Sequence, residues 1–311
     1  MTSVAANGLA PSETAALTRR VTMLSVAVAA LLVTIKLAAW IASGSVALLA
    51  SLADSGLDLV ASLATFFAVR YAVAPPDEEH RFGHGKAEAF ASLMQAGLVF
   101  ASAALIGREA VGDLVTQHPL KAEGWAIAVM AVSTVLTVVL ITAQTRVLRQ
   151  TNSVAVSGDR AHYATDLASN LVALAGIGAS ALLGINGLDA AAALVIAALL
   201  LWGAVGVFRE ASAQLMDREL PEEQRQQIVE LMTVDPRLTD VHQLRTRASG
   251  PFVHIQMHVD LDPHLTLEEA HTVVVAAEKR VLEAFPSADM IIHADPRGRA
   301  EPHGGAFAEH N

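Results

Sequence analysis

Two carboxylates interrupt a long apolar segment near the start of the chain. Asp54 and Asp58 lie within the segment 46–73, and no lysine or arginine lies between Lys36 and Arg70. Residues four apart share one face of a helix, and two like charges one turn apart favour a shared proton or a bound cation. An ionised group inside a membrane-spanning helix costs about 2.5–3.5 kcal/mol on insertion scales. The pair therefore indicates one half of a metal site.

A second pair of ligands follows about a hundred residues later. His162 and Asp166 are again four apart, and they lie in the apolar segment 154–184. Two helices that each present two ligands from one face can form a tetrahedral site, which is the geometry that zinc favours. If the two segments cross a bilayer in opposite directions, all four side chains reach a similar depth near its midplane. The sequence therefore predicts an intramembrane site for a divalent metal.

Composition places the chain among membrane proteins. It has 311 residues, of which 53% are apolar and 17% charged, and its mean hydropathy is +0.44. Soluble domains carry about 25% charged residues. The chain has no cysteine, which excludes disulfides and cysteine-ligated zinc. Its net charge is −10 and acidic residues outnumber basic ones beyond residue 217, so a nucleic-acid partner is not expected.

Six apolar segments cover the first two thirds of the chain, and each is long enough for a membrane-spanning helix. They lie at about 21–43, 46–73, 88–115, 123–147, 154–184 and 188–214. Basic residues gather before the first segment and around the connections that follow the second and the fourth. The positive-inside rule then predicts a multi-pass protein with both termini in the cytoplasm.

The region after the sixth segment has the pattern of a small α+β domain. A helix is expected to start within residues 217–223 and to run to about residue 234, and strands are expected over 241–248 and 252–261. The second strand alternates apolar and polar residues with a period of two. A helix over 266–285 begins with a capping box of Thr266 and Glu269, and a short strand follows. The expected order is α-β-β-α-β.

Four motifs that occur together resemble those of a known family. They are Asp54-x3-Asp58, His162-x3-Asp166, His80-Arg81-Phe82-Gly83-His84-Gly85-Lys86-Ala87-Glu88 and Ile291-Ile292-His293-Ala294-Asp295-Pro296. Together they resemble the cation diffusion facilitators, and above all the bacterial zinc and iron efflux transporters, over about residues 20–296. The resemblance implies a homodimer in the bacterial inner membrane. Each protomer would have six transmembrane helices and a cytoplasmic ferredoxin-like domain.

The resemblance also implies a role for individual residues. The transport site would be Asp54, Asp58, His162 and Asp166; a loop site Asp77, His80 and His84; a cytoplasmic site His242, His258, His271, His293 and Asp295; and a charge lock Lys86 and Asp217. His254 and His264 match no position of the family pattern. A histidine at position 162 goes with zinc and cadmium in the family and against manganese. The implied substrate and regulator is Zn²⁺, with Fe²⁺, Cd²⁺ and Co²⁺ as further candidates.

The expected organisation is a cytoplasmic tail over 1–20, a membrane domain over 21–215, a metal-binding regulatory and dimerisation domain over 216–296, and a disordered tail over 297–311. The expected function is secondary active export of a divalent metal in exchange for protons, by alternating access in a homodimer. No enzymatic activity is expected.

Three other classes of protein remain as alternatives. The main one is a membrane metal sensor or scaffold that binds zinc without moving it, and a channel is another. An intramembrane metalloenzyme is disfavoured, because its zinc would keep an open position for water and the sequence has no His-Glu-x-x-His helix.

Overall fold

The computed structural model describes residues 9–43, 46–116, 124–183 and 188–299. The chain divides into two compact units, Ser12–Met216 and the region from Asp217 onward. Residues 1–8 of the predicted N-terminal tail and residues 300–311 of the predicted C-terminal tail lie outside the described residues.

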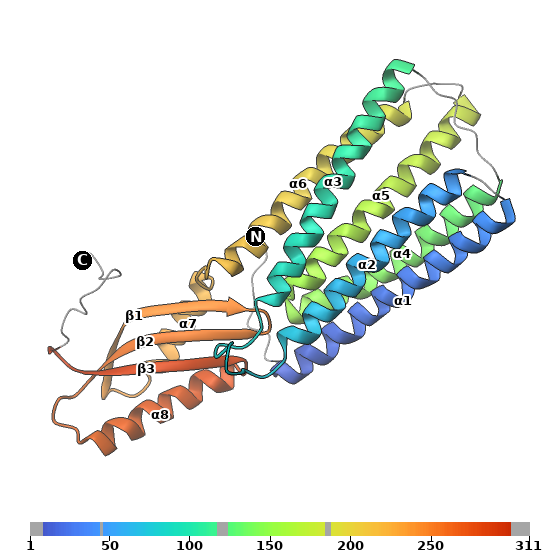
Figure 1. Ribbon diagram of the computed structural model, residues 1–311. Coiled ribbons are helices and arrows are strands. Elements are labelled where there is room, and N and C mark those ends of the chain that lie inside the picture. The colour runs from blue at the N-terminus through green and yellow to red at the C-terminus, as the bar shows by residue number, and fades with distance from the viewer. Residues whose placement is uncertain (1–8, 44–45, 117–123, 184–187, 300–311) are drawn as a thin grey trace. The chain divides into compact units, whose positions relative to one another are not determined.

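Six long helices make up the first unit and run alongside one another (Figure 1). They are α1 (Pro11–Ser43), α2 (Val46–Ala72), α3 (Ala87–Thr116), α4 (Gly124–Thr151), α5 (Val154–Leu183) and α6 (Leu188–Leu215). Helix α1 begins ten residues before the predicted start, because Pro11 suits a first helical turn and the polar residues after it continue the helix.

Five helices in the described parts of the chain are long and apolar enough to cross a membrane. They are α1, α2, α3, α4 and α6. Helix α5, at 30 residues, is also long enough to cross a membrane. The prediction of a multi-pass membrane unit is confirmed by these five helices.

Helix α5 contacts α2, α3, α4 and α6 and is therefore central to the bundle. A small residue permits one of these close approaches. A Cβ at Gly158 would lie 3.0 Å from the Ser92 Cα and 2.9 Å from its Oγ, so glycine lets α5 pack against the backbone of α3. Since His162 lies one turn further along α5, this contact helps to fix its position.

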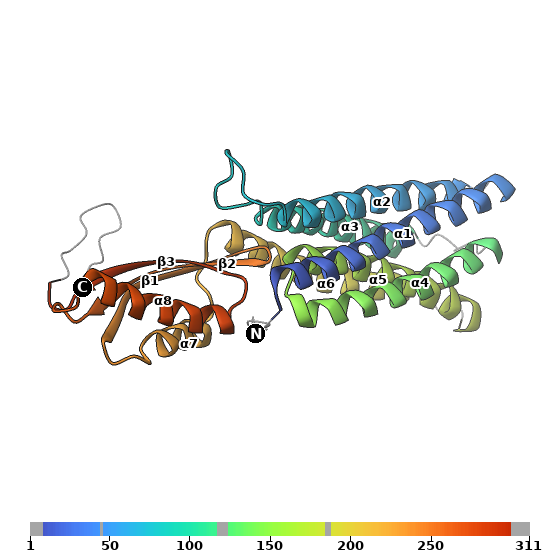
Figure 2. The ribbon, with the colours of Figure 1, turned by 90° about the horizontal axis from the view of Figure 1, so that it is seen from below.

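The second unit is a three-stranded sheet with two helices on one face (Figure 2). Its elements are α7 (Glu222–Met232), β1 (Leu238–Ser249), β2 (Phe252–Leu261), α8 (Leu267–Ala284) and β3 (Ala288–Pro296). β2 pairs antiparallel with β1 and parallel with β3, so α8 forms the crossover between two parallel strands. The predicted order α-β-β-α-β is confirmed, while the finer ferredoxin-like assignment stays a prediction.

The core of the second unit follows from the two periodicities of its sequence. Ile255, Met257 and Val259 alternate along β2 and are buried, and they meet Val273 and Val281 from one face of α8. Each fully buried side chain of this kind stabilises the fold by about 1.5–3 kcal/mol. The polar residues of β2 therefore lie on the opposite face of the sheet, which α7 and α8 leave uncovered.

Replacing Thr266 by alanine should loosen the start of α8. The Thr266 side chain accepts a hydrogen bond from the Glu269 N–H, and the Glu269 carboxylate accepts one from the Thr266 N–H. Loss of such a cap should speed amide hydrogen exchange in the first turn of α8 about fivefold. Thr272→Ala is the matched control, because Thr272 is exposed in the middle of the same helix. Equal exchange rates in the Thr266 variant and the wild type would contradict the expectation.

Candidate metal sites

One face of α2 carries the first two predicted ligands. Ser51, Asp54, Ser55 and Asp58 occupy positions i, i+3, i+4 and i+7, so all four lie on one helical stripe. Asp58 is buried at 8% exposure, whereas Asp54 is exposed. The two carboxylates thus share a face but not an environment.

Helix α5 brings the second pair to Asp58. The His162 Nε2 lies 3.0 Å from Asp58 Oδ1 and 3.9 Å from Asp166 Oδ2. One potential ligand atom from each of these three residues lies within 4.8 Å of the other two. The His162 ring is buried, and its Nδ1 has no hydrogen-bond partner among the described residues. Three ligands with one nitrogen and two carboxylates therefore converge inside the helix bundle.

Asp54 does not belong to this three-residue group. It lies one turn from Asp58 on the same face of α2, so the expected spacing is present but the four side chains do not form a closed site. Asp54 therefore lies beside the three-residue group without belonging to it.

A buried polar network next to the group was not predicted. Asp159 is almost fully buried one turn before His162, and its carboxylate accepts hydrogen bonds from Gln95 Nε2 at 3.2 Å and Gln144 Nε2 at 2.9 Å. The Tyr163 hydroxyl lies 2.8 Å from the Ser62 hydroxyl. These contacts join α5 to α2, α3 and α4. The available signal was an acidic residue three positions before His162 in a segment long enough to span a membrane.

A buried cation was also missed. Lys36 on α1 is 9% exposed, and its Nζ lies 2.5 Å from Ser55 Oγ and 3.1 Å from the Ser51 carbonyl oxygen. Between Lys36 and Arg70 the chain has no lysine or arginine, so α2 itself supplies no cation near its two carboxylates. The nearby cation comes instead from the preceding helix.

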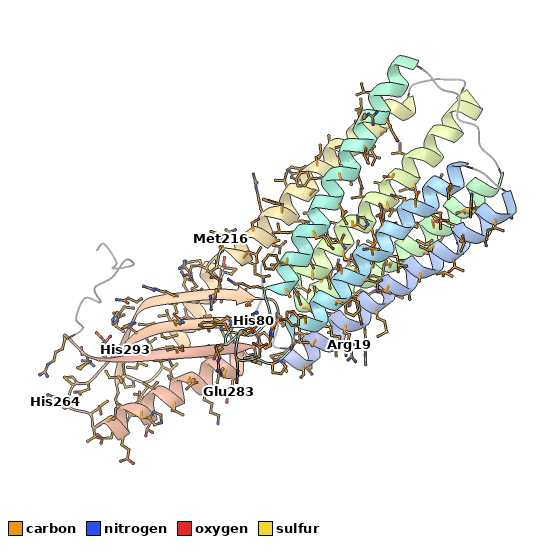
Figure 3. All side chains as sticks on the ribbon, in the orientation of Figure 1. Arg19, His80, Met216, His264, Glu283 and His293 are labelled. Carbon is orange, nitrogen blue, oxygen red and sulfur yellow. The ribbon has the colours of Figure 1, made fainter. Side chains whose placement is uncertain are left out.

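The loop after α2 gathers all three of its predicted ligands. Asp77 Oδ1 lies 3.2 Å from His80 Nδ1, and Asp77 Oδ2 lies 3.1 Å from His84 Nε2. Gly83 has a φ of +79°, a conformation that glycine adopts readily, and this turn directs the chain back so that His84 reaches Asp77. Figure 3 labels His80 within this loop. Hydrogen bonds lower the pKa of the Asp77 carboxyl below its ordinary value. The largest effect comes from the backbone N–H of His80, and smaller ones come from the His80 ring and the Glu79 N–H.

In the second unit, three histidines surround Asp295. Its Oδ2 lies 2.9 Å from His258 Nδ1 and 3.4 Å from His242 Nε2, and its Oδ1 lies 3.3 Å from His293 Nε2. The parallel register of β2 and β3 places His258 opposite His293, and the antiparallel register places it opposite His242. Figure 3 labels His293 on β3. Four of the five predicted ligands of the cytoplasmic site therefore lie together.

The pKa of Asp295 reflects these histidines. Burial acts to raise it, but the hydrogen bond with His258 and the charges of His293, His258 and His242 outweigh burial, so the pKa lies below its ordinary value. The carboxylate is held in its ionised form, which is the form that binds a metal ion.

The remaining histidines of the second unit lie apart from this cluster. His271 is exposed on α8 and belongs to none of the potential metal-binding groups of the described residues. His254 Nδ1 lies 3.2 Å from Asp289 Oδ2, and His264 is exposed in the turn before α8. A further group of Asp240, His242 and Asp260 shares one histidine with the cluster.

The predicted charge lock between Lys86 and Asp217 would join the two units, and it stays a prediction. Within the first unit, Lys86 Nζ donates to the Leu215 carbonyl oxygen at 3.3 Å. Within the second, Asp217 Oδ2 accepts from Arg247 at 3.1 Å.

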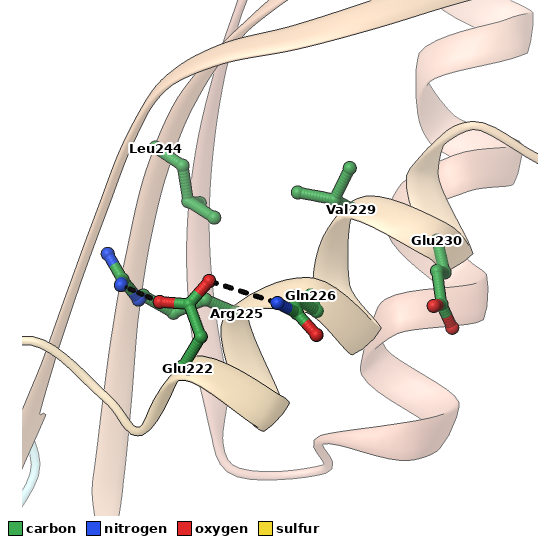
Figure 4. A pocket seen from close by; sticks show the side chains of 6 residues that line it. All are labelled: Glu222, Arg225, Gln226, Val229, Glu230 and Leu244. Atoms are coloured by element: carbon green, nitrogen blue, oxygen red, sulfur yellow. Dashed lines mark hydrogen bonds and ion pairs between the residues drawn. The ribbon is translucent and has the colours of Figure 1, made fainter.

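A groove of about 370 Å³ lies between α7 and β1 (Figure 4). It is lined by Glu222, Arg225, Gln226, Val229, Glu230 and Leu244. Glu222 pairs with Arg225 and accepts a hydrogen bond from Gln226 at 3.2 Å, so both oxygens of its carboxylate are engaged within the groove. None of the predicted ligands lines it.

Replacing Asp295 by asparagine should destabilise the second unit in metal-free protein at about pH 5. A carboxyl whose pKa is lower in the folded state than the unfolded value of ~3.9 stabilises the fold fully above ~3.9, and this contribution is lost as the pH falls through the lower value. Hydrogen exchange of β2 and β3 should therefore be several-fold faster in the variant at pH 5 and should converge with the wild type at more acidic pH. Asp289→Asn, which changes an exposed carboxylate, is the control. A difference that grows on acidification would contradict this sign.

Comparison with known proteins covers both units. Residues 22–216 match the family described as the cation efflux transmembrane domain, and residues 220–297 match the cation efflux protein cytoplasmic domain. The cation-efflux pumps FieF of Citrobacter koseri and Klebsiella pneumoniae are each 40% identical over 280 residues, covering 90% of this chain and 93% of the relative. Two solved structures of CzrB, one in its Zn form, are 30% and 31% identical with TM-scores of 0.26 and 0.25. They cover 27% and 25% of this chain and 98% and 99% of those chains.

The predicted resemblance is confirmed by these matches, and the expectation of a transporter without enzymatic activity is confirmed with it. Two units matched along their length, and a relative aligned over nine tenths of the chain, leave one conclusion: this chain is a multi-pass membrane transporter that belongs to the cation efflux, or cation diffusion facilitator, family.

Proposed function

We propose that this protein exports a divalent cation, with Zn²⁺ as the preferred substrate, from the cytoplasm in exchange for protons. The observation that carries the proposal is the convergence of Asp58, His162 and Asp166 inside the helix bundle. One imidazole and carboxylate oxygens suit zinc, and Asp54 on the same face of α2 would supply the fourth ligand. Cd²⁺, Fe²⁺ and Co²⁺ accept the same ligand set and would compete.

Proton exchange follows from the chemistry of these ligands. Zinc binds deprotonated carboxylates and neutral imidazole, so metal and protons compete for the same residues. An empty site open to the cytoplasm would release protons and take up metal, and a site open to the other side would do the reverse. Rocking of some helices against others around a fixed site is how many secondary transporters achieve this.

The remaining features extend the proposal. Helix α5 would be the sixth membrane span, and the basic connections would lie with both termini on the cytoplasmic side of a bacterial inner membrane. The cation-efflux relatives named above are bacterial proteins, which supports this location. The second unit, with a ferredoxin-like fold, would bind metal at Asp295 and draw two protomers into a homodimer. The loop site of Asp77, His80 and His84 would bind metal more weakly, with water as its fourth ligand.

Substitution of Asp58 should abolish transport without abolishing folding. In vesicles with a pH gradient and an internal zinc dye, Asp58→Ala should reduce zinc flux to the level of protein-free vesicles, because one of the three converging ligands is lost. Dimerisation should survive. Glu109→Gln, which removes an exposed carboxylate of α3, should retain flux. Undiminished flux in the Asp58 variant would refute the transport-site assignment. Wild-type flux that does not depend on the pH gradient would favour a channel. Zinc binding without any flux would favour the sensor alternative.

Removing two histidines of the second unit should uncouple metal from dimer closure. The chain has no cysteine, so a spin label at an introduced Lys279→Cys reports the distance between two protomers without background. Zinc should shorten this distance in the wild type and in the His264→Ala control, and should have no effect after combined His242→Ala and His293→Ala substitution. A zinc response that persists in the double variant would count against the regulatory role.

A further inference from the structure

Lys36 is placed beside the candidate transport site without belonging to it. Its ammonium is nearly buried, and it hydrogen-bonds to Ser55 Oγ at 2.5 Å and to the Ser51 carbonyl oxygen at 3.1 Å. A lysine seven residues from the end of α1 could instead extend toward solvent at the membrane surface. Its hydrogen bonds point across to α2, so the charge is directed into the bundle.

The position of its partners brings the ammonium close to the carboxylates. Ser51 and Ser55 lie on the helical stripe that also carries Asp54 and Asp58, and Ser55 is next to Asp54 in the sequence. Asp58, Asp54 and Asp166 all act electrostatically on Lys36. Yet the ammonium donates its two hydrogen bonds among the described residues to neutral oxygens of α2, which leaves the carboxylate oxygens available for a metal ion.

Such an arrangement has consequences for both states of the site. Several carboxylates without metal would repel one another in a low-dielectric bundle, and a fixed cation within a few ångströms offsets part of that charge. When a divalent cation binds, the same ammonium repels it. A fixed positive charge therefore stabilises the empty site and weakens metal binding, and both effects favour release.

We propose that Lys36 is a built-in counter-cation of the transport site, tethered by Ser55 and Ser51, which sets the metal affinity low enough for release. It is a positioning and tuning residue and not a ligand. The inference rests on the proposed function, because it assumes that Asp58, His162 and Asp166 bind the transported metal.

Equilibrium Zn²⁺ binding by the full-length protein tests the proposal. The background carries His84→Ala and His258→Ala, so that the loop and second-unit clusters contribute little. Lys36→Gln keeps an amide donor for Ser55 but removes the charge, and it should bind Zn²⁺ more than tenfold more tightly and release it more slowly. Lys36→Arg keeps the charge and should stay near the background affinity. Arg70→Gln is the matched control, because it removes an exposed positive charge at the far end of α2.

Each outcome decides the matter. Unchanged or weaker Zn²⁺ binding by folded Lys36→Gln overturns the proposal. If Arg70→Gln raises the Zn²⁺ affinity as much as Lys36→Gln does, the effect comes from net charge alone and the proposal is also overturned. Lys36→Met is a second neutral variant, and loss of the folded bundle in both neutral variants would show a purely structural lysine.

Asp58→Asn in the same background keeps the two proposals distinct. If it binds Zn²⁺ normally, the transport-site assignment fails, whereas lost binding there together with an unaffected Lys36→Gln removes only the role of Lys36.

Discussion

The cost of keeping charge inside a helix bundle governs this protein. Asp58, Asp159 and Asp166 would each be expensive in a low-dielectric environment without a partner. The structure compensates these carboxylates in two ways. Asp58 and Asp166 face the His162 imidazole, and Asp159 accepts two amide hydrogen bonds from neighbouring helices. The ligand site and the network that holds its helices are therefore parts of one electrostatic arrangement.

The second unit obeys a different constraint. Its stability comes from an ordinary apolar core on one face of a sheet, which leaves the other face free to gather polar ligands. Strand pairing alone aligns His242, His258 and His293 around Asp295. Because register is fixed by the core on the opposite face, the predicted ligands stay together without further support. The two units thus reach similar ligand sets by unrelated physical routes.

Much of the fold and of the candidate site could be predicted from the sequence, because helical and strand periodicities are local. The spacing of four identified the shared faces of α2 and α5, and the alternation in 252–261 identified the strand and its buried side. The capping box fixed the start of α8 to within a residue. The predicted start of α1 was wrong, because the first turns of this helix are polar and give no apolar signal. The separation of Asp54 from the other three ligands, and the exposed place of His271, were beyond reach because side-chain environment depends on neighbouring elements.

The sequence by itself determined which residues can act as ligands and which of them share a face, since both depend on residue type and on a repeat of a few positions. Only the tertiary structure decided which helices meet. Lys36 is 19 residues from Ser55, and Gln144 and Gln95 are 15 and 64 residues from Asp159, yet packing places each at hydrogen-bonding distance. Such contacts depend on the lateral arrangement of the helices, which a single apolar segment does not encode, because one helix face can pack against any neighbour of suitable shape.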